Sequence, residues 1–130
     1  MAFQTLNPAT GQVVEKFETM SDDQLENAIS LSVKAHKALK SWSLEDRAAA
    51  MHRIADILEE DAEKLGAIIT LEMGKTLSSA IGEVKKCAMG CRYYADNAAD
   101  MMADEYVDIG PAKTFKTYLP LGPILSLIHI

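Results

Sequence analysis

The sequence contains few of the residues and patterns from which common catalytic motifs are built. It has two cysteines, three histidines and one tryptophan among 130 residues. None of the patterns GxGxxG, HExxH or GxSxG occurs, so there is no dinucleotide fingerprint, zinc-protease helix or hydrolase elbow. The Gly-Lys-Thr within "MGKT" lacks the earlier glycine of a phosphate loop and follows a helical pattern. No single motif therefore indicates a reaction.

Long apolar runs and basic stretches are also scarce. The longest apolar run lies at the C-terminus and is too short to cross a bilayer of about 30 Å. The N-terminus has no basic region followed by an apolar one, so we expect a cytoplasmic location and no membrane partner. The net charge is −6, with acidic residues spread over helical segments. This distribution argues against nucleic-acid binding, which needs a basic surface.

The two cysteines do not have the spacing of a metal or redox motif. Cys87 and Cys91 are four residues apart in a helical pattern, which places both on one face. No histidine or second cysteine pair completes a zinc set, and no activating group is indicated beside them. We interpret both as small core residues. His36, His52 and His129 are isolated in the sequence and are assigned surface or packing roles.

The remaining composition, 48% hydrophobic and 25% charged, is that of a globular protein. "FQTL" and "VVEKFE" flank the turn signal "NPATGQ", which predicts a β-hairpin. Ser21 and Gln24 have the form of a capping box ahead of an amphipathic helix that extends towards Trp42. Ser43 follows as the cap of a second helix. The first half of the chain is therefore expected to be a hairpin and two helices.

Two more helices and two strands are predicted in the second half. A third helical pattern ends at Gly74, which suits a left-handed C-terminal position. Thr76, Ser78 or Ser79 can cap a fourth helix that continues to about Met102. Beyond Gly110 and Pro111, "AKTFKTYLP" alternates like a half-exposed strand and "ILSLI" resembles a buried one. Strands distributed in this way lack partners within the chain, so their edges need pairing elsewhere.

Five local signatures, taken in order, resemble one enzyme family. "LNPATGQVV", "RAAAMHRIADILEE", "AIITLEMGKT", "AIGEVKKCAMGCRYYAD" and "YLPLGPIL" are similar in order and spacing to the N-terminal part of NAD(P)-dependent aldehyde dehydrogenases. The resemblance covers residues 3–125. The short start before "NPATG" and the "EMGK" form look most like the succinate-semialdehyde dehydrogenase branch of that family.

The resemblance implies that the chain is a fragment of an α/β protein with a Rossmann-type cofactor domain. The fragment itself is expected to be mainly helical, with an N-terminal hairpin, about four helices and two C-terminal strands. Residues 1–112 would belong to the cofactor-binding domain and 113–121 to a strand of the oligomerisation sheet of a homo-oligomer. Residues 122–130 would begin the first Rossmann-type strand, truncated or non-native at 126–130.

The resemblance also implies the reaction of the parent enzyme. It would oxidise a small aldehyde, succinate semialdehyde, to the carboxylic acid with NAD or NADP. The family's cysteine nucleophile and glutamate match positions beyond residue 130, so no catalytic or cofactor-binding residue is assigned. The fragment is predicted to be inactive and to bind no cofactor. One ligand set is implied, a monovalent cation held at Thr5, Leu6 and Glu72, although Glu72 alternatively reads as an exposed helix-end carboxylate.

A reading of a different class is a non-catalytic helical module. Exposed strand edges can pair with a strand of another protein. Such a module would pair with a member of the same family through its exposed strand and perform no chemistry itself. The two readings differ in whether these residues belong to the polypeptide of an enzyme.

Overall fold

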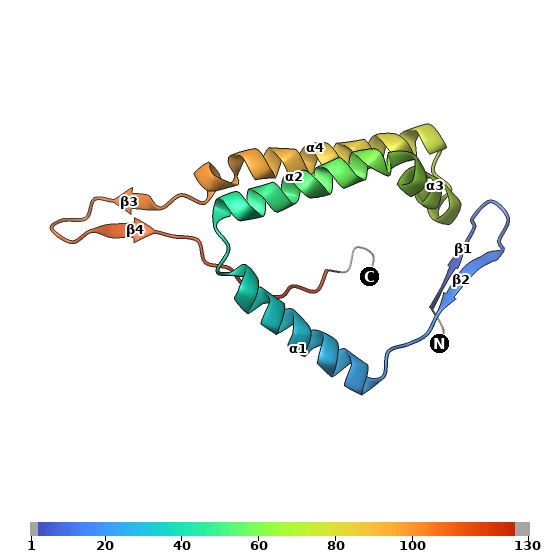
Figure 1. Ribbon diagram of the computed structural model, residues 1–130, viewed down its shortest axis with the longest axis horizontal. Coiled ribbons are helices and arrows are strands. Elements are labelled where there is room, and N and C mark those ends of the chain that lie inside the picture. The colour runs from blue at the N-terminus through green and yellow to red at the C-terminus, as the bar shows by residue number, and fades with distance from the viewer. Residues whose placement is uncertain (1–2, 127–130) are drawn as a thin grey trace.

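The computed structural model describes residues 3–126 and shows four helices and two strand pairs (Figure 1). The elements follow in the order β1 (Phe3–Leu6), β2 (Val13–Phe17), α1 (Asp22–Leu39), α2 (Leu44–Glu60), α3 (Ala62–Met73), α4 (Leu77–Met101), β3 (Glu105–Val107) and β4 (Thr114–Lys116). Both strand pairs are antiparallel and two-stranded. No helix within these residues is long and apolar enough to cross a lipid bilayer.

The predicted hairpin is confirmed, and Asn7 organises its turn. The Asn7 side-chain oxygen accepts a hydrogen bond from the backbone N–H of Ala9 at 2.9 Å. The Asn7 carbonyl accepts from the N–H groups of Thr10 and Gly11. Gly11 has a φ of 70°, which a glycine adopts without strain. Asn7 and Gly11 together thus fix the reversal between β1 and β2.

The predicted helix starts at Ser21 and Ser43 are confirmed. Gln24 N–H donates to Ser21 Oγ at 3.3 Å, and Ser21 N–H donates to Gln24 Oε1 at 2.9 Å. Ser43 makes the equivalent reciprocal pair with Asp46. Each box satisfies two backbone N–H groups that the helix itself leaves free.

The predicted end of α3 is also confirmed. Gly74 lies directly after the helix with a φ of 71°, the left-handed conformation that glycine supplies at a helix end.

The core lies among α2, α3 and α4 and is made of small residues. In Figure 1, α4 runs alongside α2, and α3 folds back against the start of α4. The buried apolar side chains are Ala55, Ala62, Ala80, Val84, Ala88 and Ala95. Small side chains let helix backbones approach closely and leave little apolar area to bury per contact. The three helices are therefore closely packed, but their core contains few side chains and little buried apolar area.

Helix α1 does not pack against the three-helix unit, and its apolar stripe is exposed to solvent. It has no buried residue, and Leu25, Ile29 and Trp42 on or beside the predicted stripe are 50%, 49% and 46% exposed. Figure 1 shows α1 on the opposite side of an open ring from α2. Arg47 donates through Nη2 to the carbonyls of Leu39 and Lys40, at 3.2 and 3.5 Å. Arg47 thereby anchors the end of α1 to the start of α2.

The chain exposes much more surface than a compact protein of its mass. Its accessible area is 10854 Å² at 14.2 kDa, whereas a folded monomer of that mass exposes about 6,800 Å². The excess of about 4,000 Å² is in the range buried by obligate complexes. Much of this surface is apolar, so the fold presents faces suited to packing against further protein.

The C-terminal region differs in detail from the sequence expectation. The residues after α4 form a strand, β3, which pairs with β4 in the register Glu105↔Lys116 and Tyr106↔Phe115. The predicted strand in "AKTFKTYLP" forms only over Thr114–Lys116. The predicted strand "ILSLI" is absent over residues 124–126, which have no strand partner within the described chain. Its remainder lies outside the described residues.

Candidate functional site

The turn of the first hairpin packs against the turn between α3 and α4. A Cβ placed on Gly74 would lie 3.0 Å from Cγ of Pro8, so these two turns are in close contact. The three residues expected to bind a cation belong to the elements that meet here. Thr5 and Leu6 end β1, and Glu72 lies in the last turn of α3.

Thr5 carries a buried hydroxyl oxygen that no other residue in 3–126 satisfies. Its Oγ1 is buried and makes no hydrogen bond with the rest of the described chain, which costs about 1–3 kcal/mol unless a ligand or water supplies one. The strand register shifts between Thr5 and Leu6, and such a bulge interrupts the ladder of backbone hydrogen bonds. A hydroxyl and a backbone carbonyl at this point are the oxygen donors that a hard cation prefers.

Glu72 is exposed at the other side of this corner. Its carboxylate makes no hydrogen bond or ion pair with any other residue in 3–126. An exposed carboxylate without these contacts is compatible with both expectations for Glu72, a cation ligand and a solvated carboxylate at the helix end. The same stretch of chain holds no group of three or more histidine, cysteine or acidic side chains placed to bind a metal. Any cation here would therefore depend on hydroxyl and carbonyl oxygens as well as on Glu72.

Lys75 and Glu83 form an ion pair beside the same corner. Lys75 Nζ donates to Glu83 Oε2, which ties the turn before α4 to the second turn of that helix. This hydrogen bond, with the charge of Lys75, lowers the pKa of Glu83 below its usual 4.5. The pair was not predicted, because its two residues are eight positions apart across a turn and no short sequence pattern marks them.

A second polar cluster joins α2 to α4. Arg92 Nη2 donates to Glu59 Oε2 at 2.7 Å and to Asp56 Oδ1 at 2.8 Å, and these bonds, that to Glu59 first, raise the pKa of Arg92. His52 Nε2 lies 3.0 Å from Asp96 Oδ1. All these contacts join the same two helices. They therefore support helix pairing, as expected for His52, and not proton transfer.

The cysteines occupy a different environment from the one predicted. Cys87 is exposed and Cys91 is half-buried, and both are free thiols. The interpretation of Cys87 as a core residue is therefore wrong. The buried line of α4 passes through Val84 and Ala88, and Cys87 lies beside that line, where it borders residues of α2 and α3 but stays exposed. His36 is half-buried on α1, and His129 lies outside the described residues.

The exposed stripe of α1 lies beside the C-terminal segment and lines two open depressions with it. One open depression is lined by Ser32, Ala35, His36, Ala38, Leu39, Trp42, Gly122 and Pro123. A second is lined by Ala28, Ile29, Ser32, Pro123, Ile124 and Leu125. Both contain hardly any polar side chain that could orient a substrate, so they are better suited to packing than to catalysis.

Comparison with known proteins identifies relatives over almost the whole chain. Residues 1–128 match the model of the aldehyde dehydrogenase family. The probable succinate-semialdehyde dehydrogenase [NADP(+)] of Synechocystis sp. is 39% identical over 128 residues. Succinate-semialdehyde dehydrogenase [NADP(+)] 1 of Mycobacterium tuberculosis H37Rv is 40% identical over 131 residues. Each alignment covers 98% of this chain but 28% and 29% of the relative.

Solved structures show the same relationship in three dimensions. Succinic semialdehyde dehydrogenase from Streptococcus pyogenes, solved with NADP+ as the cofactor, superposes with a TM-score of 0.83 at 32% identity. It matches 89% of this chain and 26% of its own. The structure of Gox0499 gives a TM-score of 0.88 at 27% identity, over 93% of this chain and 27% of its own. The predicted fold class, a mainly helical portion of an aldehyde dehydrogenase fold, is confirmed.

Proposed function

The chain belongs to the aldehyde dehydrogenase family, and from that premise we propose that it is the N-terminal part of an NADP-dependent enzyme that oxidises succinate semialdehyde to the acid. One observation carries this proposal. The chain is 39–40% identical, over 98% of its length, to relatives whose names specify that aldehyde and NADP. It spans under a third of the length of those relatives, so the activity is proposed for the longer protein.

The 130 residues contribute structure and no reacting group. We assign residues 1–112 to part of the cofactor-binding domain of the longer protein and 113–121 to a strand of its oligomerisation sheet. The segment from residue 122 onward is assigned to the first strand of that cofactor domain, whose strand partners would come from the rest of the longer protein. The excess of exposed surface supports this division, because a portion cut from a larger core exposes the faces on which the remainder packs. We expect the isolated chain to be inactive and to bind no nicotinamide cofactor.

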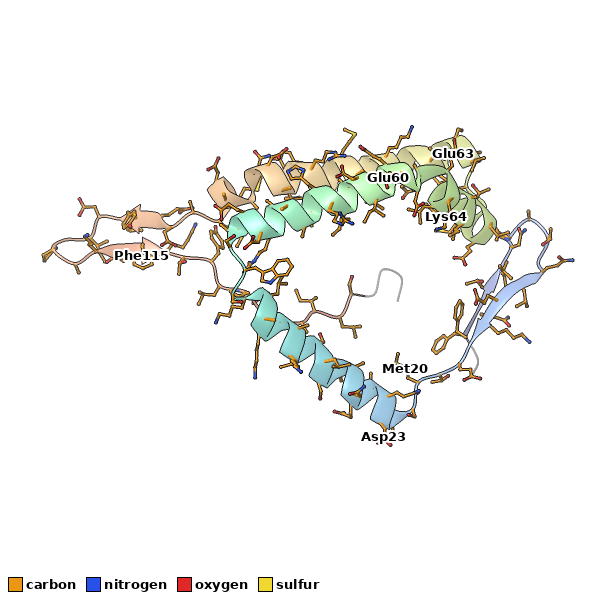
Figure 2. All side chains as sticks on the ribbon, in the orientation of Figure 1. Met20, Asp23, Glu60, Glu63, Lys64 and Phe115 are labelled. Atoms are coloured by element: carbon orange, nitrogen blue, oxygen red, sulfur yellow. The ribbon has the colours of Figure 1, made fainter. Side chains whose placement is uncertain are left out.

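The hairpin β3–β4 is the element proposed to join subunits of a homo-oligomer. Figure 1 shows it extending away from the helices, and Figure 2 places the side chain of Phe115 on its β4 strand. Within the described residues β4 (Thr114–Lys116), which lies in the 113–121 segment, pairs only with β3, so its other edge is available for pairing. The same observation supports the second candidate, a non-catalytic module that pairs with a family member through this strand.

A monovalent cation is proposed at the corner between the first hairpin and α3. The Thr5 hydroxyl and Leu6 carbonyl would hold it from β1 and the Glu72 carboxylate from α3. The partnerless Oγ1 of Thr5 supports this assignment. When bound, the cation would supply structural support between the two elements and no chemistry.

A turnover assay on the purified chain tests the division of roles. Incubation with succinate semialdehyde and NADP is expected to produce no NADPH, and titration with NADP alone is expected to leave the fluorescence of Trp42 unchanged. The matched control is the full-length Mycobacterium relative under the same conditions. Sustained NADPH production by the 130 residues that is lost in a Cys87→Ser or Cys91→Ser variant would overturn the proposal, because it would place a nucleophile inside this chain.

A further inference from the structure

The two thiols of α4 lie one helical turn apart on the same face of the helix. Cys87 is exposed and Cys91 is half-buried, and neither is in a disulfide. Side chains at i and i+4 of a helix are neighbours, with Cβ atoms about 5–6 Å apart. Both sulfurs can therefore reach one atom placed between them.

The helix itself prevents these thiols from oxidising to a disulfide with each other. A disulfide requires Cβ atoms about 3.5–4.5 Å apart, which is shorter than the separation that helical geometry imposes. A bridge with one further atom between the two sulfurs is longer and matches the available distance. Thiols are soft ligands that select soft, thiophilic centres, so the pair is suited to such a centre and not to a hard cation.

An apolar depression adjoins Cys87 and adds a second recognition element. It is lined by Leu58, Leu65, Ile68, Ile69, Glu83, Val84 and Cys87. Its one charged member, Glu83, is held in the ion pair with Lys75. A ligand bonded to Cys87 can therefore place an apolar substituent against Leu58 and Ile68 without meeting an unpaired charge.

We propose that Cys87 and Cys91 form a bidentate site for an organic trivalent arsenical with an apolar substituent, such as phenylarsine oxide. Two As–S bonds form and the As=O bond breaks, and the two thiol protons leave with the oxygen as one water. Arsenic stays trivalent, so no oxidant or reductant takes part. The site uses no group assigned to aldehyde oxidation and does not depend on the proposed function.

Thiol titration of the whole reduced chain tests the proposal, since the sequence has no other cysteine. One equivalent of phenylarsine oxide is expected to protect both thiols from Ellman's reagent. The protection should persist in excess 2-mercaptoethanol and be reversed by dithiothreitol. In Cys87→Ser or Cys91→Ser a single bond remains, and loss of the second, effectively intramolecular bond should weaken retention at least about 100-fold.

A matched control keeps two thiols but separates them. Cys91→Ser combined with Met89→Cys places the thiols two residues apart, where helical side chains do not face each other. Met89 is 67% exposed, so the exchange should preserve the fold, and far-UV circular dichroism checks this. Retention as weak as in the single variants supports the site. Wild-type retention no stronger than that of this control would overturn it.

Discussion

Gly66 is the residue on which the close approach of α3 to α4 depends. It is buried, and a Cβ there would lie 2.7 Å from Cγ1 and 3.1 Å from the backbone nitrogen of Ile81. Gly66→Ala should therefore push the helices apart and lower the free energy of unfolding by about 1–3 kcal/mol. Urea denaturation followed by circular dichroism measures the change.

The control for this prediction is Gly90→Ala in the middle of α4. A Cβ there meets nothing within 4 Å, so alanine should stabilise the helix by up to about 1 kcal/mol. Opposite signs for the two substitutions are expected. Equal stabilisation by both would show that α3 and α4 do not approach as closely at Gly66 as described.

Substitution of Glu72 tests whether its carboxylate binds the proposed monovalent cation. The melting temperature is expected to be higher in sodium or potassium chloride than in choline chloride at equal ionic strength, because a bound cation stabilises the folded state. Glu72→Gln should abolish this difference, whereas Glu63→Gln, at the other end of α3, should preserve it. A wild-type chain that melts identically in all three salts has no such cation site.

Several single residues could be interpreted correctly from sequence because their roles are local. Ser21, Ser43 and Gly74 act on backbone groups within three or four positions, and the structure confirms each of them. The exposure of Cys87 could not be predicted, since it depends on which element covers one flank of α4. Periodicity showed the face on which Cys87 lies, but it could not show how much of that face α2 and α3 leave exposed.

At the scale of elements, the Lys75–Glu83 pair predicts how the α3–α4 junction responds to pH. The pKa of Glu83 is lowered in the folded state, chiefly by the hydrogen bond from Lys75. The pair's contribution is therefore present above the unfolded pKa, near 4.5, and is lost as the pH falls through the lower folded value. Wild-type stability should drop more steeply on acidification below 4.5 than that of Glu83→Gln.

Urea unfolding across this acid range measures the difference between the two proteins. Lys75→Met provides a second comparison, because it removes the donor and should return Glu83 towards its ordinary pKa. Parallel stability curves for wild type and Glu83→Gln would show that the ion pair contributes nothing to the junction.

The elements differ in how far sequence could predict them. Helices α1 and α2 have strong periodic patterns and capping boxes, so their starts were predicted closely. Helices α3 and α4 have periodic patterns but no side-chain cap bond at their starts, so their existence was predicted more closely than where they begin. Strand β3 was missed because its three residues lack a pattern and become a strand through pairing with β4. The stripe of α1 was recognised correctly, but its exposure could not be inferred, because an amphipathic pattern does not say whether a covering element is present.

At the scale of the whole molecule, the open ring in Figure 1 and the excess surface have one explanation. Under the proposed function, the apolar side of α1, the segment around Pro123 and the hairpin β3–β4 would pack against the remainder of a longer protein or against another subunit. The five signatures of the sequence pointed to the family that the comparisons identify. They could not predict the ring itself, since that depends on how α1 turns away from α2 at Arg47.

The most direct test of the central claim is a chimera in which this chain replaces the matching first part of the Mycobacterium relative. The chimera is expected to assemble, bind NADP and oxidise succinate semialdehyde, with the exposed faces of α1 buried by the rest of the enzyme. A parallel chimera carries the matching first part of the Synechocystis relative, which is 39% identical to this chain. It controls for the effect of exchanging this part at all. The account would be contradicted if the Synechocystis chimera were active while the chimera with this chain failed to assemble. Assembly of the latter without turnover, beside an active Synechocystis chimera, would contradict it equally.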